Sequence, residues 1–231
     1  MDGDLPALIP ARRRPRWPAE RVYFLYSAVT ALLFSLIFTA SAVYQVTVAG
    51  LDALQLVLVG TVLEASIFVF EIPTGVVADV KSRRLSVILG TALIGCGFLL
   101  EGSWPSFLPI LFAQVLWGLG YTFTSGALQA WISDEAGEDH AGQIFLRGAQ
   151  LEQFGGLIGI LPAMALSFWR VNVPILAGGA LLILLAGFLA LRMPETGFHP
   201  TPAGERTTWQ HMLATFRDGL GMLKKRPALY T

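Results

Sequence analysis

The sequence predicts an all-α membrane protein, a six-transmembrane-helix bundle with cytoplasmic N- and C-termini. Three observations predict this class. Hydrophobic residues make up 54% of the 231 residues and charged residues only 14%, against about 25% charged residues in an average soluble domain. Six apolar segments match the length of about 20 helical residues that crosses a hydrocarbon core. Lysine and arginine gather on one side of these segments.

The six expected spans are joined by short polar links, and together they form a bundle over residues 22–192 that follows an N-terminal segment of residues 1–21. In chain order, the expected spans are residues 22–48, 53–78, 85–100, 107–132, 146–169 and 173–191. The expected links are residues 49–52, 80–84, 101–106, 133–145 and 170–172. Aromatic residues near the span ends fit the aromatic belt of a membrane interface. These are Tyr23, Trp104, Trp131 and Trp169.

The distribution of positive charge predicts the orientation. With the N-terminus inside, only Arg170 of the 16 lysines and arginines lies outside, which leaves 15 inside. Positive residues accumulate on the cytoplasmic side of membrane proteins. We therefore expect both termini in the cytoplasm and a multi-pass protein of the cell (inner) membrane.

The tail over residues 193–231 differs from the spans. A linker rich in proline and glycine is followed by apolar residues near helical spacing, with Lys224 and Lys225 alongside. This pattern predicts an amphipathic helix on the cytoplasmic membrane face. A partly disordered linker is the alternative.

Polar residues within the spans indicate which helices border an interior. The fourth span carries polar and small residues at steps of three and four, which places them on one helix face. They are Gln114, Gly118, Tyr121, Ser125 and Gln129. Together with Tyr44 and Gln45 of the first span, they predict a cavity bordered by the first, second, fourth and fifth spans, with the third and sixth outside facing lipid. The alternative is that these side chains only hydrogen-bond neighbouring helices.

Two carboxyl groups in the second span, Glu64 and Glu71, share a face with Gly60 and Gly75. An ionisable group inside a membrane is expensive and turns toward a partner or a wet cavity. We expect both to belong to the proton or substrate cavity. Alternatively, Glu71 bonds backbone groups near Pro73.

The segment from Gly75 to Arg84 covers the end of the second span and the turn after it, and it also holds Asp79 and Arg83, while Asp134 lies just past the fourth span. This turn resembles the loop between the second and third helices of major facilitator superfamily transporters. Residues 71–75 and 125–134 are also similar to a drug-efflux-like bacterial branch. The resemblance implies one half of a major facilitator fold, the N-terminal six-helix half, and covers nearly the whole chain.

The resemblance further implies a cytoplasmic charge latch made by Gly75, Asp79, Arg83 or Arg84, and Asp134. Such a network stabilises one state of the transporter and breaks when the halves rock. The alternative is that the loop only sets topology. Departures from the family pattern are Val80, Ser82 and Gln114.

The expected function is secondary active transport of a small, amphipathic molecule by alternating access, with proton-coupled efflux as the favoured form. A second six-helix half or a homodimer partner is expected. The alternative is a non-transporting truncated product or a membrane interaction partner. No enzymatic activity, cofactor or nucleic-acid partner is expected. Nor do we expect a metal, since residues 138–140 are best explained as a solvated polar loop.

Overall fold

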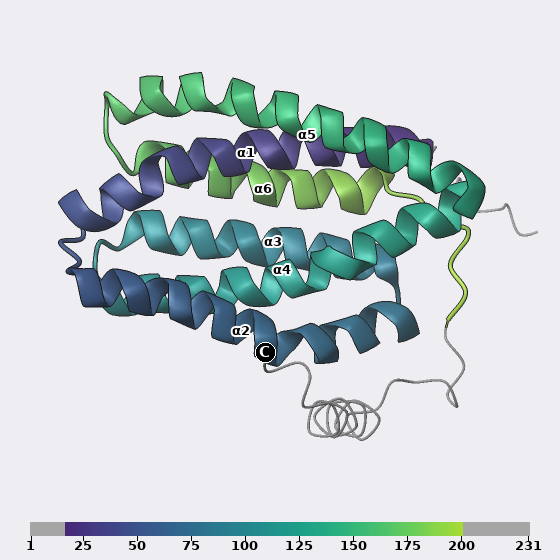
Figure 1. Cartoon of the computed structure of the whole chain (residues 1–231), viewed down its shortest axis with the longest axis horizontal. Helices are drawn as coiled ribbons and strands as arrows, with labels where there is room; N and C mark the ends of the chain where they lie inside the picture. Colours follow the sequence, from purple (N-terminus) through teal and green to yellow (C-terminus); the bar gives the residue numbers. More distant parts are fainter. Residues whose placement is uncertain (1–16, 201–231) are drawn as a thin grey trace, which may run out of the picture.

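The computed structural model describes residues 17–200, which form six long α-helices joined by short turns (Figure 1). The helices are α1 (Ala19–Thr47), α2 (Ala53–Val80), α3 (Arg83–Ser103), α4 (Phe107–Ala136), α5 (Glu138–Ser167) and α6 (Val173–Arg192). The described residues contain no strand. The predicted all-α bundle is therefore confirmed.

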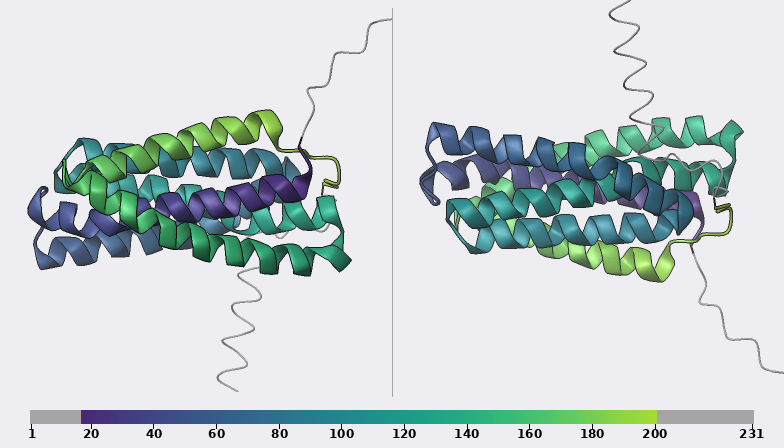
Figure 2. Two further views of the ribbon diagram at one scale, coloured as in Figure 1. Left: turned by 90° about the horizontal axis from the view of Figure 1, so that it is seen from above. Right: turned by 90° about the horizontal axis from the view of Figure 1, so that it is seen from below.

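The helices pack side by side in the order α5, α1, α6, α3, α4 and α2, and this order is visible from top to bottom in Figure 1. Seen from above and below, they run nearly along one common axis (Figure 2). The turns α2–α3 and α4–α5 and the segment after α6 lie at one end, which we call the Asp134 end. The other three connections lie at the opposite end, which we call the Glu101 end.

Helix starts follow from local hydrogen bonds. At the start of α2, the Asp52 carboxylate accepts a hydrogen bond from Gln55 N at 2.8 Å, and the Gln55 side chain accepts one from Asp52 N at 3.0 Å. At the start of α3, Ser82 Oγ accepts from Leu85 N at 2.9 Å. These contacts satisfy amide groups that have no partner within the helix.

Two expected links are wrong. Residues 133–145 are almost entirely helical, because α4 continues to Ala136 and α5 begins at Glu138. Gly137 turns the chain between them with a φ of 83°, and the acidic first turn of α5 suits the positive end of the helix dipole. The link expected at residues 101–106 is shorter, because α3 continues to Ser103 and includes Glu101.

Five of the six helices combine the length and hydropathy that a membrane crossing needs. The exception is α5, which carries Arg147 and Glu152 within its length. It nevertheless lies along α1 over much of its length (Figure 1). The expected fifth crossing therefore depends on this packing rather than on the hydropathy of α5.

The burial of the helices differs from the predicted division into four helices around a cavity and two outer helices. α3 packs between α4 and α6 and is the most enclosed of the five apolar helices, whereas α2 is the least. An outer position for α3 within this bundle is therefore wrong. α2 and α5 lie at the two ends of the row, because each packs mainly against one neighbour. Lipid contact by the remaining exposed residues of α3 and α6 stays a prediction.

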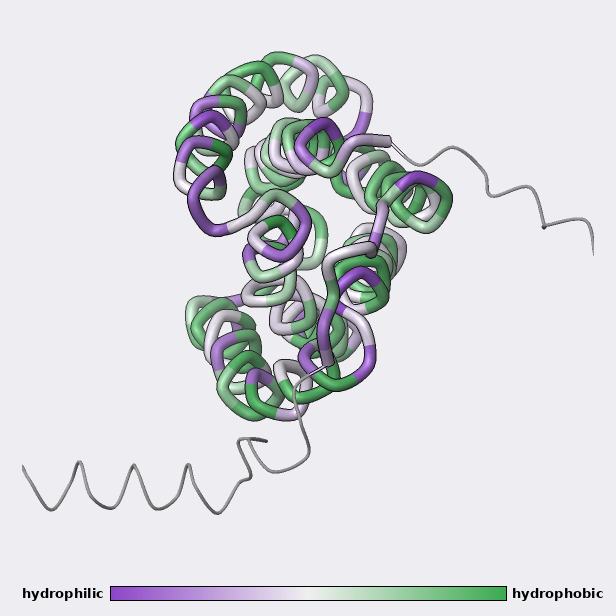
Figure 3. The backbone as a smooth tube through the Cα atoms, turned by 90° about the vertical axis from the view of Figure 1, so that its right-hand side faces the viewer, coloured by the Kyte–Doolittle hydropathy of each residue, from purple (hydrophilic) through white to green (hydrophobic). Residues whose placement is uncertain are grey.

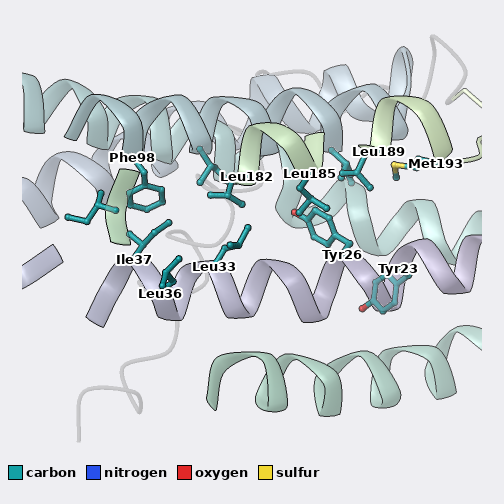
Figure 4. Packing of buried hydrophobic residues seen from close by; sticks show 14 of the residues in the cluster. Tyr23, Tyr26, Leu33, Leu36, Ile37, Phe98, Leu182, Leu185, Leu189 and Met193 are labelled. Atoms are coloured by element: carbon teal, nitrogen blue, oxygen red, sulfur yellow. The ribbon is translucent and has the colours of Figure 1, made fainter. Parts of the chain in front are cut away.

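The apolar core lies where α1, α3 and α6 meet (Figure 4). Ile37 of α1 and Leu182 of α6 have no exposed surface, and Phe98 of α3 is 1% exposed. Fully burying side chains of this size contributes about 1.5–3 kcal/mol each where water is the alternative. This core joins α1, α3 and α6 at the centre of the bundle.

Close packing of α5 on α1 depends on Gly155 and Gly159. A Cβ at Gly155 would lie 2.3 Å from Ala28 O, and one at Gly159 would lie 2.4 Å from Leu32 O. Only glycine lets the two backbones approach this closely. This glycine pair therefore brings α5 into close contact with α1.

We expect the substitution Gly155→Val to destabilise the chain by about 1–3 kcal/mol, because the added atoms overpack the contact between α1 and α5. The matched control is Gly156→Val, since a Cβ at the neighbouring glycine meets nothing within 4 Å. Thermal unfolding of the purified variants in detergent measures the difference. Equal melting of the two variants would refute the packing account.

The predicted amphipathic helix lies outside the described residues, as do residues 1–16 of the N-terminal segment. Residues 193–200 are described and run along the Asp134 end (Figure 1). We call them the strap.

Candidate functional site

The Asp134 end carries a charge network that joins three helices. Arg83 is the first residue of α3. Its Nη1 atom donates hydrogen bonds to Ala130 O at 2.9 Å and to the Asp134 carboxylate, both on α4. Its Nη2 atom lies 3.7 Å from Asp79 Oδ1 at the end of α2. Arg83 therefore connects α2, α3 and α4 through a single guanidinium group.

Of the two arginines that the sequence left open, Arg83 makes this network and Arg84 makes different contacts. Arg84 N donates to Glu195 Oε1 at 2.9 Å, and its guanidinium donates to Ala190 O of α6. Gly75 lies about one turn before Asp79 on α2, where a Cβ would meet nothing within 4 Å. Contacts among residues 17–200 therefore do not require glycine at that position.

The strap contributes contacts that the sequence analysis missed. Ser82 Oγ donates to both carboxylate oxygens of Glu195, at 2.9 and 2.8 Å. Trp131, which the sequence placed in an aromatic belt, is 1% exposed and donates from Nε1 to Pro194 O at 2.7 Å. The Arg83 guanidinium also lies 5.9 Å from the ring centre of Phe198. The strap thus holds the α2–α3 turn against the end of α4.

A second carboxylate holds the strap from the α4 side. Glu135 accepts a hydrogen bond from Thr196 Oγ1 at 2.7 Å and another from Gly197 N at 2.7 Å. The signal in the sequence was the Pro194-Glu195 pair directly after the last span. Sequence reasoning had assigned it only to a linker. Figure 3 looks onto this end and shows hydrophilic stretches in the turns nearest the viewer.

We expect Glu195→Ala to lower the stability of the chain by about 1–2 kcal/mol, as loss of a helix cap does. Glu195 accepts hydrogen bonds at the start of α3, where the helix dipole also favours a negative charge. Glu152→Ala on exposed α5 is the control. Thermal unfolding in detergent measures the stability of both variants. If Glu195→Ala loses no more stability than Glu152→Ala, Glu195 does not cap α3.

The polar stripe on α4 divides into two parts. Gln114 and Gly118 are buried, and a Cβ at Gly118 would lie 2.8 Å from Ser66 Cβ on α2. Tyr121 and Gln129 are exposed, and Ser125 is half-buried. The structure therefore places only the last three at an open face, while Gly118 allows close packing of α2 on α4.

Glu64 and Glu71 are both exposed on α2. Within residues 17–200, neither side chain makes an ion pair or hydrogen bond. Close to Glu71, a groove of about 280 Å³ lies between α2 and α4. It is lined by residues that include Gly75, Asp79 and Ser125. The structure thus brings Glu71, part of the α4 stripe and one end of the charge network to one groove.

Tyr44 and Gln45 lie elsewhere, at the Glu101 end. Tyr44 Oη donates to Glu101 O at 2.9 Å, and Gln45 Nε2 donates to Glu101 Oε1 at 2.9 Å. Gln114 Nε2 donates to Glu101 Oε2 at 3.2 Å. Glu101 is 1% exposed. Sequence reasoning missed it because it was placed in a link, although it follows an apolar run without a break.

Candidate metal ligands do not gather in the part of the chain that the structure describes, since no three His, Cys, Asp or Glu side chains form a group there. Glu138, Asp139 and His140 occupy the exposed first turn of α5.

Comparison with known proteins agrees with this geometry. A profile described as Major Facilitator Superfamily matches residues 5–160. The chain is 26% identical over 192 residues to the uncharacterized MFS-type transporter YxaM of Bacillus subtilis (strain 168). That match covers 80% of this chain and 46% of the relative, so the chain spans about half the length of this relative. The chain belongs to the Major Facilitator Superfamily and corresponds to a six-helix half of a membrane transporter.

Proposed function

We propose that this chain forms one half of a secondary active transporter that moves a small, amphipathic molecule by alternating access. The observation that carries this proposal is the exposed face of α2. There, Glu64 and Glu71 stand on a helix apolar enough to cross a membrane, without a partner among the described residues. Carboxyl groups at membrane depth face water or protein rather than lipid. A water-filled substrate pathway meets that requirement.

A second six-helix bundle supplies the other wall of the pathway in this proposal. Large apolar side chains remain exposed on the two end helices, among them Phe68 on α2 and Phe154 on α5. Transporters with internal repeats bind substrate between two bundles. The second bundle is either a six-helix half or another copy of this chain, and the length of the relative supports the first.

The charge network at the Asp134 end acts as the latch. The pair between Arg83 and Asp134 is partly accessible, with 17% and 26% of the two side chains exposed. Asp79 is 53% exposed and has room for a further partner. A helix N-terminus in the second bundle would favour such an anion. Separation of the two bundles at this end would then break the contact.

The same carboxyl groups support proton coupling in this proposal, with efflux as its direction. A carboxyl in a cavity can exchange its proton for a cationic molecule when access changes from one side to the other. We place the Asp134 end in the cytoplasm of a cell with the chain in its inner membrane. Lys81, Arg83 and Arg84 lie at that end, which supports this orientation.

Reconstitution into lipid vesicles tests the proposal with ethidium, an amphipathic cation, as the probe. We expect a pH gradient to drive ethidium accumulation above that of protein-free vesicles, and a protonophore to abolish it. Equal ethidium accumulation with and without the pH gradient would exclude proton coupling.

The second candidate is a non-transporting product or a membrane interaction partner. The observation that favours it is that the chain spans only about half of its relative. Native sizing of the purified chain separates the two candidates. A monomer without ethidium flux supports this second candidate, and a dimer with flux supports transport.

A further inference from the structure

We propose that Glu101 is a reversible proton-binding site whose proton switches the hydrogen bonds that join α1 to α4 through α3. The site comprises the carboxyl group of Glu101 and the amides of Gln45 and Gln114. It lies at the opposite end from the charge network and does not depend on transport.

The first step is the isolation of the carboxyl group. Glu101 is 1% exposed and Gln114 is 2% exposed. Both ion pairs among the described residues involve Arg83, at the other end of the bundle. A buried carboxylate without a cation is costly, and binding a proton removes its charge.

The second step is that the same side chains satisfy both forms of the carboxyl group. In the present arrangement both oxygens accept hydrogen bonds, one from Gln45 at 2.9 Å and one from Gln114 at 3.2 Å. This arrangement suits the ionised form. A protonated carboxyl has one O–H donor, and an amide that turns over offers its carbonyl oxygen as the acceptor. No other residue has to move.

The third step identifies the amide that turns. A turned amide presents its NH₂ group to a new partner. Gln114 is buried, whereas Gln45 is half-buried near the end of α1, where water can serve as that partner. Gln45 is therefore the responsive side chain.

The backbone around the carboxyl group is held independently. Tyr44 Oη donates to Glu101 O at 2.9 Å, and Asn172 Nδ2 donates to Gly102 O at 3.0 Å. Neither bond depends on the protonation of the side chain. Protonation can thus change the side-chain bridge without displacing α3.

Protons can approach from a neighbouring pocket of about 480 Å³ at the same end. Its wall includes Gly102 and Ser103, which follow Glu101 in the chain, and Tyr44, which donates the hydrogen bond to Glu101 O. Arg170 and Asn172 of the α5–α6 turn also line this pocket. Arg170 is the charged group on that wall, and Tyr44 is the titratable one.

Infrared difference spectroscopy between acidic and alkaline buffer tests the proposal on the full chain in lipid nanodiscs. The chain has 16 Asp and Glu residues, so several carboxyl groups contribute to the protonated-carboxyl region of the difference spectrum. We expect one component of that region to be missing in Glu101→Gln and retained in the control Glu64→Gln. Gln45→Leu should shift the pH midpoint of that component, whereas Gln150→Leu on exposed α5 should not. A structural role alone would leave these midpoints equal.

The proposal is overturned if Glu101→Gln shows the same carboxyl band as the unmodified chain, or if Gln45→Leu leaves the midpoint unchanged. Should Glu101→Gln fail to fold, Glu101→Asp replaces it. A band altered in frequency or midpoint then supports the site, and an unaltered band overturns it.

Discussion

Replacing Arg83 by methionine is expected to produce the largest loss of stability at the Asp134 end. The guanidinium holds Asp134 and Ala130 of α4 and lies near Asp79 of α2, so its removal leaves a carboxylate without its cation. Breaking a buried pair costs about 3–5 kcal/mol. Because both partners are partly exposed, we expect a loss on the order of 2–3 kcal/mol. Thermal unfolding in detergent measures it.

The control for this substitution is Lys81→Met, which removes a cation from the same turn at an exposed position. Exposed charges of this kind contribute at most about 1 kcal/mol. The reversed pair Arg83→Asp with Asp134→Arg should recover part of the loss. If Lys81→Met were as damaging as Arg83→Met, general attraction between the turn and the membrane surface would explain the effect instead.

Replacing Glu64 by glutamine is expected to produce the largest loss of transport. We expect pH-driven ethidium accumulation to fall by about tenfold or more, equivalent to about 1.4 kcal/mol or more. Thermal stability should change little, because Glu64 is exposed and makes no polar contact with the described residues. Flux and unfolding are measured on the same preparation.

The matched control is Glu152→Gln, which neutralises an exposed carboxyl group on α5 instead of α2. Equal flux by both variants and the unmodified chain would remove Glu64 from the transport pathway. Equal loss by both would indicate a general effect of surface charge.

The sequence was sufficient for the count of the described helices and for the class, and the members of the charge network came from the family resemblance. Apolar segments of membrane length leave few alternatives to a helical bundle, since backbone groups in lipid must be satisfied internally. Asp79 and Arg83 are four residues apart, so their proximity is nearly local. The choice of Arg83 over Arg84 was not predictable, because it depends on where α4 places Asp134.

The Glu101 cluster and the strap could not be predicted, for a different physical reason. Both join residues far apart in the chain, such as Gln45 with Glu101 and Ser82 with Glu195. Hydropathy reports the length of a span but not which face meets which neighbour. A glutamate near a span end therefore looked like part of a solvated link, although it is buried between helices.

The proposed transport pathway requires that the open face of α2 and α4 meets water while the chain is in a membrane. Cysteine labelling in membranes measures this in a Cys96→Ser background, because Cys96 is the only cysteine. We expect a membrane-impermeant maleimide to react with Glu71→Cys and Tyr121→Cys but not with Leu89→Cys, an exposed position on the otherwise enclosed α3. Protection of all three positions would show that lipid covers this face and would contradict the account.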